Sequence, residues 1–176
     1  MCFSDCVRTG CPWNNSCGFA AKGGQLKVLQ WLRAKGCPWD AEACMNAANG
    51  GHLEVLRWSR ANGAPWDEMT CTGAAQGGQL EVLQWARTSG CPWDDRTCAN
   101  SAGDGHLDVL RWALANGCPW HPRTCANAAA GGGHLEVLKW MRANGHANQN
   151  IWHYCKLAAR ANQHWKVLAW LHENKA

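Results

Sequence analysis

The chain has 176 residues, of which 47% are hydrophobic and 17% are charged, so it can bury a core and lacks the low-hydrophobicity, high-charge signature of disorder. No stretch approaches the ~20 apolar residues of a membrane helix, and residues 1–10 lack the basic and then apolar pattern of a signal peptide. We therefore expect a cytoplasmic or nuclear protein without membrane insertion. The net charge of +4 is too small to establish a nucleic-acid partner.

The first predicted element is a degenerate cap helix over residues 1–10, in which Cys2, Phe3 and Cys6 are apolar. One pattern then recurs about every 27 residues, which indicates a solenoid of stacked units. The predicted repeats span residues 11–36, 37–63, 64–90, 91–117 and 118–145, and a divergent C-terminal capping repeat spans residues 146–176. All of them form a single domain.

Three series of residues define the period. The first series contains the tryptophans that follow a proline: Trp13, Trp39, Trp66, Trp93 and Trp120. The second series contains a later tryptophan of each unit: Trp31, Trp58, Trp85, Trp112, Trp140 and Trp170. The third series contains cysteines: Cys17, Cys44, Cys71, Cys98 and Cys125, with Cys155 as a looser member. Because the three series stay in phase, the repeat is a property of the whole chain.

Residues 91–117 show why each unit is predicted to form two short helices. Pro92 breaks any helix that arrives from upstream, and Asp94 is a candidate N-cap, with Asp40 and Asp67 as its counterparts. The first helix is rich in small residues, so neighbouring helices can approach closely. A glycine-containing turn ends it. The second helix carries a stripe of apolar residues at helical spacing: Leu107, Val109, Leu110, Trp112 and Ala113.

The charges of the second helices agree with the helix dipole. Acidic residues stand in the first turn, at Glu54, Glu81, Asp108 and Glu136, and basic residues stand near the end, at Arg60, Arg87 and Arg142. Helix stability therefore accounts for most of the basic residues. A basic stripe that binds a partner is the alternative.

The stretch from Gly133 to Leu138, preceded by Thr124 and the pair Ala128–Ala129, resembles the ankyrin repeat. Units of that family have ~33 residues, and the residues missing here fall where the family places a projecting β-hairpin. The resemblance implies an all-α, ankyrin-like solenoid of stacked antiparallel helix pairs with a concave face. It also implies protein–protein recognition, here through the first helices and the C-P-W linkers.

The repeated tryptophans and cysteines both have a structural interpretation. We expect the second-helix tryptophans to pack in the core, and the C-P-W tryptophans to hold the linkers on the helices with their N–H groups bonded to carbonyls. An exposed ladder that stacks on bases is the alternative.

We expect the twelve cysteines to be reduced, buried and small. Cysteine pairs seven residues apart, such as Cys91 and Cys98, do not have the spacing of a structural zinc site. Cysteines of successive units are expected roughly 10 Å apart, beyond disulfide reach.

The histidines that follow glycine, His52, His106 and His134, are replaced by Gln25 and Gln79 in other units. Glutamine cannot perform acid–base chemistry, so a capping or turn hydrogen bond explains both residue types better than catalysis. We predict no catalytic residue, no metal site and no cofactor.

Function is expected where the copies differ on the first-helix face. The candidate partner-binding residues are Glu42, Met45, Met69, Thr72, Arg96, Asn100, Arg123 and Asn127. The sequence favours a non-enzymatic scaffold that binds a protein partner, as a monomer or as a subunit of a complex. The alternatives are a structural subunit of a larger assembly, a nucleic-acid-binding module that uses Arg, Lys and Trp, and a cysteine-based metal or redox protein.

Overall fold

The computed structural model describes residues 15–40 and 42–174, which form helices joined by short turns and linkers without strands. The first helices of the units are α2 (Ser16–Lys22), α4 (Ala43–Asn49), α6 (Glu68–Gln76), α8 (Asp95–Gly103), α10 (Pro122–Gly131) and α12 (Gln149–Ala161). The second helices are α3 (Leu26–Ala34), α5 (Leu53–Ala61), α7 (Leu80–Thr88), α9 (Leu107–Ala115), α11 (Leu135–Ala143) and α13 (Trp165–Glu173). The predicted all-α solenoid of helix pairs is confirmed, whereas the cap helix predicted over residues 1–10 lies outside the described residues.

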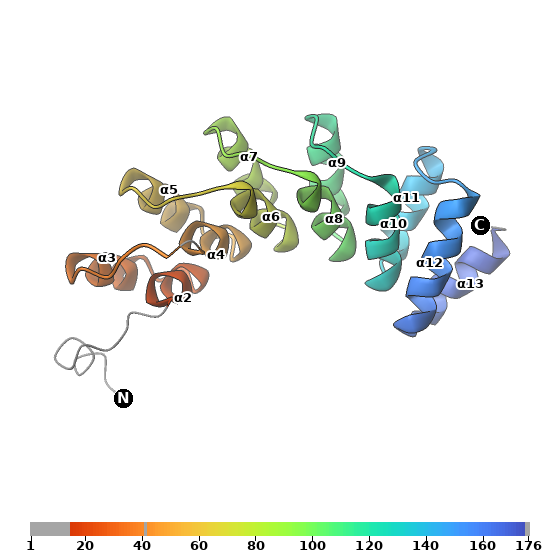
Figure 1. The fold of residues 1–176 in the computed structure, drawn as a ribbon, viewed down its shortest axis with the longest axis horizontal. Helices are drawn as coiled ribbons and strands as arrows, with labels where there is room; N and C mark the ends of the chain where they lie inside the picture. Colours follow the sequence, from red (N-terminus) through yellow and green to blue (C-terminus); the bar gives the residue numbers. More distant parts are fainter. Residues whose placement is uncertain (1–14, 41, 175–176) are drawn as a thin grey trace.

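The helix pairs follow an arc, with the first helices on its inner side and the second helices on its outer side (Figure 1). Each first helix packs against the first helix of the next unit, whereas consecutive second helices approach each other less closely. The cause is side-chain size. Alanine and cysteine fill the buried positions of the first helices, and valine and leucine fill those of the second helices. The closer packing on the inner side makes the stack curve.

A histidine joins each of several units to the one before it. The His52 Nε2–H donates to the carbonyl oxygen of Lys22 at 2.9 Å, at the end of α2. Its ring fills the space beside Gly24, which has a φ of +67° and where a Cβ would lie 2.6 Å from the ring. The same bond recurs at His106 and His164. The predicted hydrogen bond is therefore confirmed for His52 and His106, although it connects two units and does not cap the helix that follows the histidine. His164 makes the same bond but was not part of the prediction.

We expect His106→Ala to lower the free energy of unfolding by about 1 kcal/mol, because it removes the bond to the carbonyl oxygen of Gln76. His106→Gln is the comparison variant. Gln79 holds the same position one unit earlier, but it donates to the carbonyl oxygen of Gly77 within its own unit, at 2.8 Å. Glutamine should therefore recover only a local bond, and His106→Gln should lie between the parent and His106→Ala. Urea denaturation of both variants checks the prediction. An unchanged free energy of unfolding in His106→Ala would contradict it.

The predicted N-caps are confirmed at two of three positions. The carboxylates of Asp67 and Asp94 each accept a hydrogen bond at 3.0 Å from the backbone N–H two residues later. The prediction for Asp40 is wrong. Because α4 begins only at Ala43, the Asp40 carboxylate accepts the backbone N–H of Gly18 at 2.6 Å instead. It therefore ties the linker to the preceding unit.

Candidate functional site

The beginnings of the first helices lie next to one another along the inner side of the arc, and we call this row of helix starts the inner edge. It contains the linker residue before each helix and the first turn of α4, α6, α8, α10 and α12. The inner edge matters because the copies differ there, while the rest of the unit repeats.

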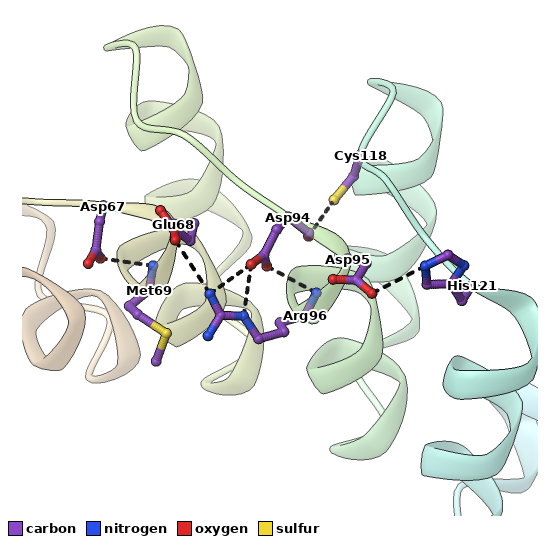
Figure 2. A network of polar contacts seen from close by, with 8 residues as sticks. All are labelled: Asp67, Glu68, Met69, Asp94, Asp95, Arg96, Cys118 and His121. Carbon is purple, nitrogen blue, oxygen red and sulfur yellow. Dashed lines mark hydrogen bonds and ion pairs between the residues drawn. The ribbon is translucent and has the colours of Figure 1, made fainter.

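Carboxylates gather where the inner edge passes α6 and α8. Figure 2 shows the Arg96 guanidinium between Asp94 and Glu68, which come from successive units. Its Nε and one terminal nitrogen contact the Asp94 carboxylate at 2.8 and 2.7 Å, and the same terminal nitrogen lies 3.6 Å from Glu68. These contacts raise the pKa of Arg96, with the hydrogen bond to Asp94 as the main cause. One cation therefore links the starts of α6 and α8.

The inner edge continues from α8 to α10 through an exposed pair. The His121 Nε2 lies 3.5 Å from a carboxylate oxygen of Asp95 (Figure 2). Beyond it, the Arg123 guanidinium lies over the Tyr154 ring of α12, 3.8 Å from the ring centroid. The inner edge thus changes from mainly acidic at α6 and α8 to basic and aromatic at α10 and α12.

The structure places most of the predicted site residues on or near this surface. Glu42, Arg96, Arg123 and Asn127 are exposed, and Met45, Met69 and Asn100 are half-buried. Thr72 is only 3% exposed, so its side chain is not available to a partner. It is buried because α6 is enclosed between α4 and α8.

Several residues of the inner edge were absent from the predicted set: Glu68, Asp94, Asp95, His121 and Tyr154. Glu68 and Asp95 could have been found, since they lie in the same variable stretch as Met69 and Arg96. Asp94 and His121 hold the preceding position, which is an aspartate in three units and therefore gave no such signal. Tyr154 gave no such signal, because the last unit has lost the repeat pattern.

The tryptophans lie between the second helices and the linkers. The prediction that the second-helix tryptophans pack in the core is confirmed only in part. Trp31 is 38% exposed. The other five are half-buried and pack against the core, namely Trp58, Trp85, Trp112, Trp140 and Trp170. Valine and leucine two or three positions earlier fill the core instead. Trp58, Trp85 and Trp112 each pack against a linker tryptophan, as in the Trp66–Trp85 pair with centroids 5.9 Å apart. Trp140 packs against His146 instead, and Trp170 packs against Trp152 of α12.

Arginines cover the other side of the linker tryptophans. The Arg60 guanidinium lies 4.1 Å from the centroid of Trp66 and donates to the carbonyl oxygen of Ala64 at 2.5 Å. Arg33 and Arg87 make the corresponding contacts. The predicted bond from a linker indole to a carbonyl is confirmed at Trp39, which donates to Asn62 at 2.9 Å. These rings therefore hold the linkers in place, and an arginine and a second tryptophan occupy their faces.

The cysteines of the described residues are all buried, as predicted. The expected separation of roughly 10 Å between cysteines of successive units is wrong for thiols that are 20 residues apart. The Sγ atoms of Cys17 and Cys37 lie 3.1 Å apart. The thiols of Cys91 and Cys118 donate to the carbonyl oxygens of Asp67 and Asp94, at 3.3 and 3.4 Å. Cys91 raises the pKa of the Cys71 thiol, and Cys118 raises that of Cys98. The reason for these close approaches is the antiparallel helix pair, which places the end of each second helix beside the start of its own first helix. Within the described residues, no group of three or more His, Cys, Asp or Glu side chains is placed to hold a metal.

We expect the buried thiols to react with a maleimide only when the protein unfolds. Burial raises the pKa values of Cys44, Cys125 and Cys155 from 9.0 to about 12, so little thiolate forms near neutral pH. Unfolded thiols release their protons above pH 9, so these three groups should lower the free energy of unfolding as pH rises from about 9 to about 12. Peptide mapping after labelling with and without urea checks the first expectation. Rapid labelling of these three cysteines in the native protein would contradict it.

Comparisons with known proteins identify the fold. Neither a protein-family model nor a curated protein sequence matches the chain. The structure is similar to that of the ankyrin repeat domain of human ASB11, with a TM-score of 0.65 and 19% sequence identity. The match covers 91% of this chain and 83% of that domain. This chain has the ankyrin-repeat fold. The resemblance predicted from Thr124 to Leu138 is thus confirmed for the fold.

The ankyrin-repeat fold of this chain has short linkers between its units, and the linkers contain no strand in the described residues. The surface between units is therefore formed by helix starts and linker side chains. No helix in the described part of the chain is long and apolar enough to cross a membrane.

Proposed function

We propose that this chain is a non-enzymatic scaffold that binds a protein partner along the inner edge. The ankyrin-repeat fold generally mediates protein–protein interaction. The observation that carries the proposal is that repeated and differing residues occupy different places within each unit. Most repeated residues pack the interior or connect units, whereas several residues that differ between copies, namely Glu42, Arg96 and Arg123, are exposed at neighbouring helix starts.

This division also argues for binding rather than catalysis. The histidines that recur are used to join units, and glutamine replaces them at two positions. The chemistry offered by the inner edge consists of exposed charges, an aromatic ring and half-buried methionines. Arginine, tyrosine and methionine are enriched in protein–protein interfaces.

The same surface supports a second function, that of a subunit held in a larger assembly by its inner edge. A nucleic-acid partner is less well supported. Arginine and tryptophan side chains cover the ring faces of the linker tryptophans on which bases would stack, and carboxylates line the starts of α6 and α8. Burial of the described thiols argues against cysteine-based metal or redox chemistry. Reduced thiols fit the cytoplasm or nucleus, which we propose as the site of action.

Charge reversal on the inner edge tests this proposal. Glu68→Lys should weaken capture of the partner, because it repels a basic group that faces α6. The exposed Glu68–Arg96 contact contributes at most about 1 kcal/mol, so the fold should persist. Cross-linking and mass spectrometry would identify the captured protein and the cross-linked residues.

Glu81→Lys is the matched control, since it makes the same change on an exposed residue of the second helix α7. We expect it to leave capture unchanged, and both variants should keep the circular dichroism of the parent. Equal loss of the partner in both variants, or cross-links confined to the second helices, would overturn the proposed surface.

A further inference from the structure

A shallow hollow lies at the α10–α12 end of the inner edge. Its volume is about 380 Å³. The residues that line it are Arg123, Asn148, Asn150, Ile151, His153 and Tyr154. The lining thus combines a cation, amide groups, an aromatic ring and an aliphatic side chain.

The cation in this hollow is positioned before any ligand arrives. Arg123 is exposed, and the Cζ atom of its guanidinium lies over the Tyr154 ring, 3.8 Å from the ring centroid. Among the described residues, no carboxylate forms an ion pair with it. Stacking restricts the side chain, so less entropy is lost when its N–H groups bind a carboxylate.

The charges of the chain are divided between its central and C-terminal units. In residues 40–108 the acidic residues are Asp40, Glu42, Glu54, Asp67, Glu68, Glu81, Asp94, Asp95, Asp104 and Asp108, and the basic residues are Arg57, Arg60, Arg87 and Arg96. In residues 109–176 the acidic residues are Glu136 and Glu173, and the basic residues are Arg111, Arg123, Lys139, Arg142, Lys156, Arg160, Lys166 and Lys175. The net formal charge is therefore negative for residues 40–108 and positive for residues 109–176.

The helix starts reinforce this change. The first turns of α6 and α8 contain Glu68 and Asp95, each preceded by a capping aspartate. The first turns of α10 and α12 contain no acidic residue. A helix start favours negative charge. The start of α12 is capped only by the neutral side chain of Asn148, which accepts the backbone N–H of Ile151 at 3.2 Å.

We propose that the hollow lined by Arg123 and Tyr154 binds an acidic residue of the protein partner, next to an apolar residue that packs on Tyr154 and Ile151. This inference rests on the proposed scaffold function and adds the chemistry of the partner. The Arg123 guanidinium donates to the partner's carboxylate, and the amides of Asn148 and Asn150 supply further donors. A continuous polyanion fits less well, because its next phosphates would run toward Asp95 and Asp94.

The single tyrosine of the chain makes the hollow directly observable. In protein with carbon-labelled tyrosine, the ring signals of Tyr154 report binding at this place alone. The probes are a capped peptide of alternating glutamate and leucine, the same peptide with glutamine in place of glutamate, and single-stranded oligothymidylate. We expect the glutamate peptide to shift the Tyr154 signals in a saturable manner, and the glutamine peptide to bind roughly tenfold more weakly.

Two variants separate the hollow from general charge effects. Arg123→Gln should lower the affinity for the glutamate peptide roughly tenfold, to the affinity that the parent has for the glutamine peptide. Lys139→Gln removes one positive charge from the exposed face of α11 and should leave the affinity unchanged. Equal affinity for both peptides, or no effect of Arg123→Gln, would overturn the inference. A response of Tyr154 to oligothymidylate at lower concentration than to the peptide would assign the hollow to nucleic acid and also overturn it.

The failure of this inference can be told apart from failure of the proposed function. If Glu68→Lys loses the captured partner but Tyr154 does not respond to the glutamate peptide, the scaffold function stands and the acidic-residue site is wrong. If Glu68→Lys captures as much partner as the parent, and the glutamate peptide does shift the Tyr154 signals, the hollow binds acidic peptides but the proposed inner-edge interface is wrong.

Discussion

We expect Gly77→Ala to lower the free energy of unfolding by about 1–3 kcal/mol. Gly77 follows α6, and a Cβ at this position would overlap with the backbone carbonyl oxygen of Asn49 at the end of α4. A backbone carbonyl cannot turn aside as a flexible side chain can. The two helices would have to move apart, which would open the closest contact of the inner side.

The matched control for this substitution is Asp104→Ala. Asp104 holds the same position after α8, where the chain already accommodates a Cβ on an exposed residue. We expect this change to alter stability by at most about 0.5 kcal/mol. Thermal and urea denaturation measure both variants. Similar values for the two would show that α4 and α6 do not need a glycine at their contact.

The period of the sequence was sufficient to predict the stack of helix pairs, because each apolar stripe can be buried only against another unit. The N-caps show where such reasoning is limited. Asp40, Asp67 and Asp94 occupy the same place after a tryptophan, yet only the last two cap a helix. The difference is a later helix start at α4, which a comparison of residue types does not reveal.

The site could be predicted only as a region. Differences between copies led to the inner edge, and Arg96 and Arg123 both lie on it. The contacts that give the inner edge its character join residues from different units, as Arg96 and Glu68 do. A spacing rule within one unit cannot predict such contacts. The predicted separation of the cysteines fails for the same reason, because Cys17 and Cys37 approach each other only through the antiparallel course of α2 and α3.

The largest loss of stability is expected from Leu110→Ala, at about 2–5 kcal/mol. Leu110 lies in α9 in the middle of the stack and is completely buried. Removing its side chain leaves a cavity that the neighbouring units fill only in part. Chemical denaturation measures the loss.

The repeat supplies a control for this variant as well. Leu168 holds the same position in α13 of the last unit, where it is only half-buried. We expect Leu168→Ala to cost clearly less than Leu110→Ala. Equal losses would mean that stability does not depend on neighbours on both sides.

Hydrogen exchange should show where the damage spreads. In a stack stabilised by nearest-neighbour contacts, Leu110→Ala should speed exchange in α8 and α9 and in the units on either side, and much less in α2 and α3. Uniform acceleration over the whole chain would contradict this. The local effect bears on function, because α8 and α9 lie where the inner edge passes from the carboxylates around Arg96 to the hollow around Arg123. A partner that spans both parts needs this unit to hold them at a fixed separation, so Leu110→Ala should weaken binding without changing any residue of the surface.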